Sequence, residues 1–466
     1  YGDHRDLHLS LRRQRQMCIR DSSGPDPSLE AMSPVYPTNP ISRRLLLTQG
    51  TAGVGMLGLA NVFGQESSSP LDARPPHSAP RAKRIIHLLM NGGPSHIDTF
   101  DPKPLLAKYE GQRPSTVDLN TQRKTTGILK SPYRFSQHGQ SGLWVSELFP
   151  HVARHADKLC LIHSMYTDIP EHISGLLMMN VGVNQPTRPS MGSWLSYGLG
   201  SANRNLPGYV VLITGSVAGA GNSLWGSGFL PTIHQGVEFR SQGDPVLFLS
   251  NPGGVTPKSR RDIVDGINAL NRIALADVGD PEIATRIAQY ELAYRMQSSV
   301  PELMDIRREP AATLETYGAK PGATSLANNC LLARRLVEKG VRFVQLFDQG
   351  WDHHSGLFNS LPNKARQLDR PVAALIADLR ERGLLDETLV VIGAEFGRTP
   401  MLQGRSNGGA PNNVGRDHHR EAYSVLLAGG GVRGGITHGR TDELGYGPVE
   451  LSLIHISEPT RPRLIA

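Results

Sequence analysis

The 466-residue chain has only three cysteines, few aromatic residues (6%) and no long uninterrupted apolar run. Without about twenty consecutive apolar residues, no ordinary membrane-spanning helix is predicted. No cysteines have the spacing of a zinc motif, and Cys160 and Cys330, both in apolar surroundings, are either a disulfide or two buried thiols. The net charge is +7, but no basic run is interleaved with aromatic residues, so a nucleic-acid partner is not expected.

The rest of the composition is typical of a globular protein, with 38% hydrophobic and 20% charged residues. A chain of this length can bury a full core, either in one large α/β domain or in two or three smaller ones. The 50 Gly and 34 Pro residues indicate long loops.

Both ends of the chain differ from its middle. Residues 14–22 and 451–462 resemble peptides obtained when sequencing-adapter DNA is translated by mistake. We therefore interpret residues 1–31 as an artefactual leader and residues 451–466 as an artefactual tail. On this interpretation the gene product begins at Met32, and its own C-terminal end is missing.

An export signal is predicted over residues 32–64. Arg43 and Arg44 precede a short run rich in Leu, Gly and Ala, which is the pattern of a twin-arginine signal. A short anchor helix or a chance arginine pair is the alternative. Residues 65–83 are rich in Ser and Pro and are predicted to be a linker. We therefore expect the protein in the periplasm or outside the cell.

Apolar runs rich in β-branched residues predict strands that are buried on both faces of a sheet. These runs cover residues 85–90, 159–162, 209–213, 341–347, 388–392 and 423–428. Apolar residues at helical spacing predict helices over residues 282–297, 325–339 and 361–382. Residues 101–146 and 214–258 are predicted to be long loops or a small cap over the sheet. The pattern predicts the α/β class, with a mostly parallel central sheet, over residues 84–450.

Three segments each place a carboxylate close to an imidazole after a strand-like run. They are residues 91–98, 351–354 and 415–419. In a sheet of parallel strands, the loops at the carboxyl ends meet at one edge, so distant segments can form one site. Any one loop alone is better explained by a capping Asp and a solvated His, but the coincidence of three favours a metal centre.

The candidate metal ligands are Asp98, Asp352, His354, Asp417 and His418, and Glu395 is a further candidate. Mixed oxygen and nitrogen ligands suit zinc, manganese or iron better than calcium, and the repeated acidic and histidine pairs suit one or two divalent ions. We favour zinc or manganese.

Arg398 follows the strand predicted at residues 388–392, close to Glu395. Its guanidinium has the donors to hold an anionic substrate oxygen, and we count it among the candidate catalytic residues. The alternative is an ion pair between Arg398 and Glu395 that steadies the loop.

Several motifs together resemble those of one known family. The motifs are NGGPSHIDTFDPKP at residues 91–104, GWDHH at 350–354, EFGRTP at 395–400, GRDH at 415–418 and TDELG at 441–445. They are similar to those of an exported bacterial family, abundant in planctomycetes, that is called domain of unknown function 1501. This family lies within the alkaline phosphatase and sulfatase superfamily, and the resemblance spans roughly residues 43–450.

The resemblance implies an alkaline-phosphatase-like α/β/α sandwich with long loop insertions and with metal ligands at the carboxyl ends of the strands. It matches the superfamily's first metal-binding Asp to Asp98. The later pairs are matched by Asp352 with His354 and by Asp417 with His418. The His-rich segment that the family carries after its TDELG-like motif is replaced in this chain by the adapter-like tail.

Hydrolases of this superfamily also place a nucleophile at the start of a helix near the first Asp. The matching stretch, residues 167–177, has no Cys, and Thr167, His172 and Ser174 are the candidate catalytic residues. Alternatively, Thr167 is a turn residue, Ser174 is an ordinary helix position and His172 supports a ligand by a hydrogen bond.

The resemblance therefore implies an exported, metal-dependent hydrolase of phosphate or sulfate esters, acting on an anionic ester or a sulfated carbohydrate. A non-catalytic periplasmic or surface binding protein that retains the sulfatase-like fold is the main alternative. A metal-dependent mutase or phosphonate hydrolase on the same scaffold is a third hypothesis.

Overall fold

The computed structural model describes residues 69–114, 123–217, 219–247, 249–403 and 413–450. The described residues all belong to the second of the two units into which the chain divides, Ser67–Ala466. The predicted leader, export signal and tail lie outside the described residues.

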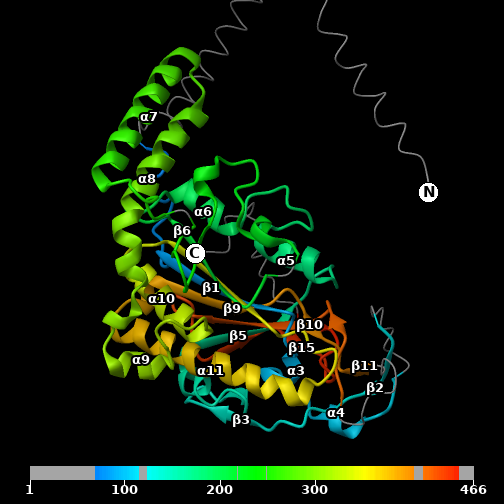
Figure 1. The fold of residues 1–466 in the computed structure, drawn as a ribbon. Coiled ribbons are helices and arrows are strands. Elements are labelled where there is room, and N and C mark those ends of the chain that lie inside the picture. Colours follow the sequence, from blue (N-terminus) through cyan, green and yellow to red (C-terminus); the bar gives the residue numbers. More distant parts are fainter. Residues whose placement is uncertain (1–68, 115–122, 218, 248, 404–412, 451–466) are drawn as a thin grey trace, which may run out of the picture. The chain divides into compact units, whose positions relative to one another are not determined.

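A mostly parallel sheet of eight strands lies at the centre of the second unit, in the order β14-β5-β13-β9-β1-β8-β6-β7 (Figure 1). Its strands are β1 (Arg84–Asn91), β5 (Leu159–Met165), β6 (Tyr209–Thr214), β7 (Val237–Phe239), β8 (Phe343–Gln349), β9 (Thr388–Gly393), β13 (Tyr423–Ala428) and β14 (Ile436–His438). Within this sheet β13 is antiparallel to both neighbours, β9 and β5, and the other pairings are parallel. The predicted α/β class is confirmed.

Helices and short strands complete the described part of the chain. The α-helices are α3 (His96–Thr99), α4 (Leu105–Lys108), α5 (His172–Val181), α6 (Met191–Leu199), α7 (Pro257–Val278), α8 (Pro281–Met304), α9 (Ala311–Tyr317), α10 (Leu326–Glu338) and α11 (Leu357–Glu381). The 3-10 helices are η1 (Val152–Lys158), η2 (Gly221–Trp225), η3 (Thr232–His234), η4 (Ile306–Arg308) and η5 (Leu385–Glu387). The short strands are β2 (Thr125–Ile128), β3 (Phe135–His138), β4 (Leu143–Ser146), β10 (Gly397–Arg398), β11 (Met401–Gln403), β12 (His418–His419), β15 (Arg440–Thr441) and β16 (Pro448–Glu450).

The two faces of the sheet are covered by different helices. Side chains alternate along β1, so that Leu88 and Met90 pack in a cluster with α10 and α11, whereas Leu89 packs in a second cluster with α5. A strand that is buried on both faces has no polar side to show, which explains the continuous apolar runs in the sequence. The fold is thus an α/β/α sandwich with β1 in its interior.

The two segments predicted to be long loops or a cap contain short helices and strands. Residues 101–146, predicted to be irregular, contain α4, β2 and the β3-β4 hairpin, and residues 214–258 contain η2, η3 and β7. Cys160 and Cys330 are free thiols, both buried. None of the described helices combines the length and the apolarity needed to cross a bilayer.

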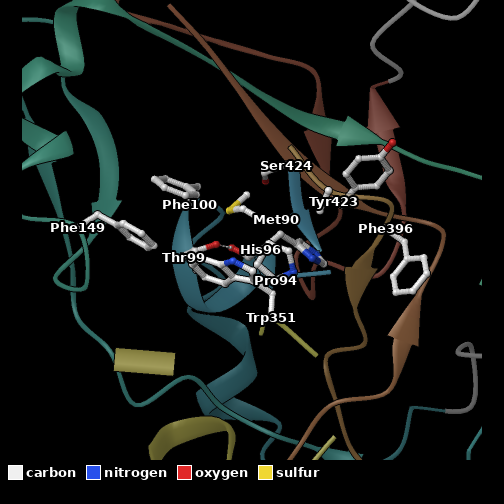
Figure 2. Close-up of a pocket in the computed structure, with 11 residues that line it drawn as sticks. Met90, Pro94, His96, Thr99, Phe100, Phe149, Trp351, Phe396, Tyr423 and Ser424 are labelled. Carbon is white, nitrogen blue, oxygen red and sulfur yellow. Dashed lines mark hydrogen bonds between the residues drawn. The ribbon is translucent and has the colours of Figure 1, made fainter. Parts of the chain in front are cut away.

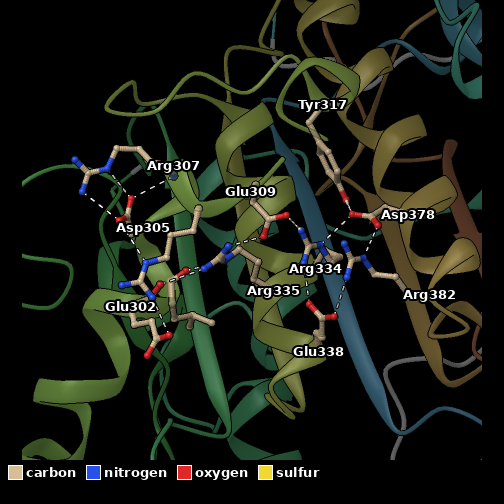
Figure 3. A network of polar contacts seen from close by, with 12 residues as sticks. Glu302, Asp305, Arg307, Glu309, Tyr317, Arg334, Arg335, Glu338, Asp378 and Arg382 are labelled. Atoms are coloured by element: carbon tan, nitrogen blue, oxygen red, sulfur yellow. Dashed lines mark hydrogen bonds and ion pairs between the residues drawn. The ribbon is translucent and has the colours of Figure 1, made fainter. Parts of the chain in front are cut away.

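A buried ion-pair network joins α10 to α11 and to the segment before α9 (Figure 3). The Arg334 side chain is 2% exposed, and its nitrogens lie 2.6 Å from Glu309, 2.7 Å from Glu338 and 3.0 Å from Asp378. Asp378 also accepts a hydrogen bond from the Tyr317 hydroxyl at 3.0 Å. A single guanidinium therefore contacts carboxylates from three segments of the chain.

Replacing Arg334 by methionine is expected to lower the free energy of unfolding by about 3–5 kcal/mol, because it leaves buried carboxylates without their shared cation. Urea denaturation measures this loss. Arg382→Met is the matched control, since Arg382 pairs with Glu338 and Asp378 but its side chain is 34% exposed, and a loss of about 1 kcal/mol or less is expected. Equal small losses in the two variants would show that the network is not a stabilising element.

Candidate metal centre

Four side chains with metal-ligand chemistry converge at the edge of the sheet where the parallel strands end. They are His172, Asp352, His354 and His418. Asp352 and His354 lie in the loop after β8, and His172 is the first residue of α5, which follows β5. His418 lies in β12, which pairs with β10 directly after β9.

The direction of β13 explains how His418 reaches this edge. Residues 415–419 are predicted to follow a strand, whereas in the structure they precede one, β13. Because β13 is antiparallel to β9, its first residue, Tyr423, lies at the edge where β9 ends. A loop before an antiparallel strand therefore meets the loops that come after parallel ones.

One nitrogen or oxygen atom from each of the four side chains lies within 4.8 Å of the corresponding atoms of the other three. His354 Nε2 and His418 Nε2 are 2.9 Å apart, and Asp352 Oδ1 lies 3.1 Å from the first and 3.5 Å from the second. His172 Nε2 is 3.4 Å from Asp352 Oδ2. Three imidazoles and one carboxylate form a donor set that suits a divalent transition metal.

In each imidazole, the Nδ1 atom is within hydrogen-bond distance of an oxygen atom outside the group of four. The Nδ1 atoms of His172, His354 and His418 lie 2.7, 2.6 and 2.7 Å from the Glu395 carboxylate, the Gln403 amide oxygen and the Pro170 carbonyl, respectively. An Nδ1–H that donates to such an oxygen leaves Nε2 for the centre of the group, which is the usual arrangement behind metal-binding histidines. The Nε2 atoms of His354 and His418 then face each other across 2.9 Å, and both can be ligands of a cation that lies between them.

Burial and neighbouring charges give these groups different proton affinities. Burial, together with the charge of Arg398, lowers the pKa of His354 to about 4, so this ring is neutral at pH 7. Burial disfavours the charged form of His172 too, but hydrogen bonds to Asp352 and Glu395 outweigh it and raise the pKa of His172 to about 9. Burial alone would raise the pKa of Asp352, yet hydrogen bonds from neighbouring imidazoles and the charge of Arg398 hold it far below its usual value. A cation that binds here has to displace the proton from His172.

Arg398, predicted to orient an anionic substrate, is buried and already bonded. Its Nη2 lies 2.6 Å from Asp352 Oδ1 and also donates to the Gly92 carbonyl. Its Nε donates to the Gly93 carbonyl at 2.7 Å, and its Nη1 donates to the Arg416 carbonyl at 3.1 Å. The guanidinium therefore fastens the Asp352 carboxylate to the loop after β1.

The loops after β1 and β8 approach each other closely at Gly92. Its φ is +120°, and a Cβ atom at this position would lie 2.3 Å from the Asp352 amide nitrogen and 2.7 Å from the Trp351 carbonyl carbon. Only glycine fits both the backbone conformation and the space. The position of Asp352 thus depends on a residue that has no side chain.

Gly92→Ala is expected to weaken metal binding by about 10–100-fold, because the added methyl group displaces the backbone of Asp352. Titration of the variant with zinc measures the change. Gly383→Ala is the control, since Gly383 also has a positive φ, of +68°, but nothing within 4 Å of the added Cβ atom. Unchanged zinc affinity in Gly92→Ala would show that the contact between these loops does not position Asp352.

Asp98, predicted to be the first metal ligand, is paired with Arg416. Its Oδ2 lies 2.8 Å from Arg416 Nε and accepts from the Ser95 hydroxyl at 2.6 Å, and its Oδ1 lies 3.3 Å from Arg416 Nη2. Both side chains are fully buried. The structure places Asp98 in α3, outside the group of four.

Asp417 and Glu395, two further predicted ligands, lie beside the group. Asp417 Oδ1 is 3.7 Å from His354 Nδ1 and has no hydrogen-bond partner within the described residues, while Oδ2 accepts from the Arg123 amide at 2.7 Å. Glu395 Oε1 holds His172, and its Oε2 also lacks a partner in the described part of the chain. Each carboxylate thus keeps one unpartnered oxygen.

The carboxylates of the centre outnumber its buried cation. Asp352, Glu395 and Asp417 all act electrostatically on Arg398, and Arg398 together with protonated His172 offsets two of these three negative charges. The negative excess is the charge environment in which a divalent cation is stabilised.

The two hydroxyl groups predicted as nucleophiles take part in local structure. Thr167 Oγ1 accepts from the Ile169 amide at 3.3 Å, which makes Thr167 a turn residue. The Ser174 amide donates at 2.9 Å to Glu171, the N-cap of α5. In the described residues neither Thr167 nor Ser174 has a hydrogen bond to the group of four.

Figure 2 shows a small, mostly apolar pocket that shares one lining side chain, Phe396, with the surroundings of the candidate metal centre. Phe396 lines it and also contacts the rings of His172 and His418, with centroids 5.0 and 4.6 Å away. His96 lies at its edge and donates from Nε2 to the Gly445 carbonyl at 2.9 Å. The TDELG motif thereby helps to hold the loop after β1 in place.

Part of this centre differs from the prediction. His172 is predicted as a catalytic residue, whereas the structure groups its ring with the metal-ligand side chains, and neither Gln403 nor the Pro170 carbonyl is among the predicted site residues. The histidine at the expected helix start was a usable signal. No sequence signal marks Gln403, which lies in the short strand β11.

The fold and this centre define an α/β/α protein with a candidate metal site at the carboxyl edge of its sheet. Residues 82–458 match the family described as protein of unknown function (DUF1501), and the chain belongs to this family. No curated protein matches the chain.

Several solved structures are similar to the chain at low sequence identity. Alkaline phosphatase from the Antarctic bacterium TAB5 is 12% identical, with 78% of this chain and 95% of that chain covered and a TM-score of 0.31. A protein in the alkaline phosphatase superfamily from Vibrio parahaemolyticus is 12% identical, with 82% and 70% covered and a TM-score of 0.30. The PsFucS1 sulfatase from Pseudoalteromonas sp. is 13% identical, with 78% and 66% covered and a TM-score of 0.29. These values are too low to transfer a ligand or a residue role to this chain.

Proposed function

We propose that the chain is a metal-dependent hydrolase of phosphate or sulfate esters. The observation that carries the proposal is the convergence of three imidazoles and one carboxylate, with each ring held from behind by an oxygen. The choice of phosphate and sulfate esters follows the resemblance of the motifs to the alkaline phosphatase and sulfatase superfamily.

The residues present fit a divalent cation, with zinc or manganese as the preferred ion. His354 and His418 turn their Nε2 atoms toward each other across 2.9 Å, and the nearby carboxylates exceed the cations. The unpartnered oxygens of Asp417 and Glu395 leave donors for a second ion. A bound ion would polarise an ester oxygen and lower the pKa of a bound water.

The side chains of the centre have separate tasks in this proposal. Glu395 orients His172, and Arg398 holds the Asp352 carboxylate against the loop after β1. The Asp352 side chain is 43% exposed, whereas His354 is 13% and His418 is 6% exposed. The group therefore opens to solvent at Asp352, and an ester can approach it from that side.

A substrate screen tests the proposal. The purified chain, loaded with zinc or manganese, is expected to hydrolyse at least one class among aryl phosphates, phosphodiesters and aryl sulfates. Activity should disappear after chelation and return when the metal is added back. Metal-loaded protein that cleaves none of these esters would overturn the proposal.

A non-catalytic binding protein is the second candidate. Two observations favour it: four protein ligands complete a tetrahedral set, as in structural zinc sites, and neither predicted hydroxyl nucleophile is bonded to the group. Protein that binds zinc tightly but hydrolyses no ester would support this role.

We also propose that the protein is exported, on the basis of Arg43, Arg44 and the apolar run after them. Residues 32–64 fused to a reporter that works only after twin-arginine export are expected to deliver it. Replacing both arginines by lysine should abolish delivery, and delivery that persists in this variant would contradict the proposal.

A further inference from the structure

Helix α7 exposes a row of aliphatic side chains that nothing in the described part of the chain covers. Ile263, Ile267 and Leu270 lie on one side of α7 and are between 36% and 70% exposed, and Ile273 and Val278 are exposed on either side of this row. Soluble proteins rarely leave several large aliphatic residues exposed along one helix without a binding partner. Figure 1 shows α7 packed beside α8, with the two helices extending away from the sheet.

Polar contacts between α7 and α8 hold the two helices together as a hairpin. Val264 and Asn268 are the buried residues of α7, and Asn268 donates to Glu291 of α8 at 2.8 Å. Arg261 reaches the same Glu291 carboxylate at 2.7 Å and lies over the Tyr294 ring at 4.7 Å. These contacts occupy one side of α7 and leave the aliphatic row on another.

The spacing of the row is that of a coiled-coil seam. Ile263, Ile267, Leu270 and Ala274 are separated by four, three and four residues, which is the alternation of a and d positions in a heptad repeat. Continuing the pattern by three residues in each direction gives Arg260 and Asp277. The seam therefore has an aliphatic centre with a cation at one end and an anion at the other.

Two copies of α7 that pack antiparallel would match apolar residues with apolar residues and opposite charges with each other. In antiparallel coiled coils an a position meets a d position, so Ile267 would face Leu270 of the second copy and Ile263 would face Ala274. Arg260 would face Asp277 at both ends. A parallel pair would instead place Arg260 against Arg260 and Asp277 against Asp277, which is repulsive.

We propose that α7 is a homodimer interface in which two copies of the chain pair through antiparallel α7 helices. The charges at the two ends of the seam favour a second copy over an unrelated partner, because a two-fold axis brings each Arg260 to an Asp277. An isologous contact of this kind closes on itself and gives a dimer rather than a fibre.

Analytical ultracentrifugation of the full chain tests the interface. The unmodified protein is expected to be a dimer, and Leu270→Glu is expected to raise the dimer dissociation constant by at least about 30-fold. Ala269→Glu is the matched control, since it adds the same charge at an exposed position of α7 outside the row and should leave the dimer intact. Circular dichroism checks that every variant is folded.

A charge exchange tests the ends of the seam. Arg260→Asp is expected to weaken the dimer, and the double variant Arg260→Asp/Asp277→Arg is expected to restore it. For the orientation, Ile263→Cys protein mixed with Ala274→Cys protein should cross-link with a short bismaleimide, whereas Ile263→Cys protein alone should not.

Three outcomes would overturn the proposal. They are an unmodified protein that stays monomeric at high micromolar concentration, a dimer that Leu270→Glu leaves unchanged, and cross-linking by Ile263→Cys alone. A monomer that binds lipid vesicles through α7 would assign the row to a membrane surface instead. Ester hydrolysis by the monomeric variant is expected to persist, so the interface and the proposed activity fail or succeed separately.

Discussion

Asp352→Ala is expected to lower kcat/KM for ester hydrolysis on the order of 10³-fold or more. Asp352 is the only carboxylate in the group of four, and its oxygens lie close to His172, His354 and His418. Removing it takes away the one charged ligand and also leaves the buried Arg398 without its counter-ion. Steady-state kinetics with the best substrate of the screen, together with metal content, measure both effects.

A second substitution tests whether the charge of Asp352 is what matters, and a distant aspartate serves as the control. Asp352→Asn keeps the shape of the side chain and removes only its charge, so it is expected to lose nearly as much activity as alanine. Asp386→Ala is the control, because Asp386 is exposed in η5, which precedes β9 and so lies at the other end of that strand from the metal centre. Normal activity in Asp352→Ala would remove this residue from the site.

Asp98→Ala is expected to destabilise the fold by about 3–5 kcal/mol while leaving the metal content unchanged. Asp98 and Arg416 form a fully buried ion pair at 2.8 Å. Removing Asp98 leaves the Arg416 charge buried without a counter-ion. Chemical denaturation measures the first effect and elemental analysis measures the second.

The double variant Asp98→Ala/Arg416→Met provides the matched control for this pair. It removes both charges together, so it is expected to recover part of the stability that Asp98→Ala loses. A different result for Asp98→Ala, with loss of metal and little loss of stability, would identify Asp98 as the metal ligand that the motif resemblance implies.

The core of the fold could be predicted because strands buried on both faces leave a clear record in the sequence. The run that became β1 has no polar alternation, since Leu88 and Leu89 pack under different helices. The edge strands β7 and β14 have only three residues each and are partly exposed, so they lack such a run. The antiparallel direction of β13 is set by pairing between distant strands, which local pattern does not encode.

The candidate site could be predicted in part for similar reasons. Asp352, His354 and His418 stand in motifs next to strands, and the structure brings these three together. The pairing of Asp98 with Arg416 joins residues 318 positions apart, and nothing local distinguishes a carboxylate that meets a buried guanidinium from one that meets a metal. For the same reason the support of His354 by Gln403 is visible only once the chain is folded.

Metal stoichiometry is the most direct test of the claim that His172, Asp352, His354 and His418 form a metal centre. The purified protein, equilibrated with zinc and freed of excess by dialysis, is measured by elemental analysis beside the folded double variant His354→Ala/His418→Ala. We predict that zinc stays bound to the unmodified protein and is lost from the double variant. An unmodified protein without metal, or a double variant that keeps the full amount, would contradict the account.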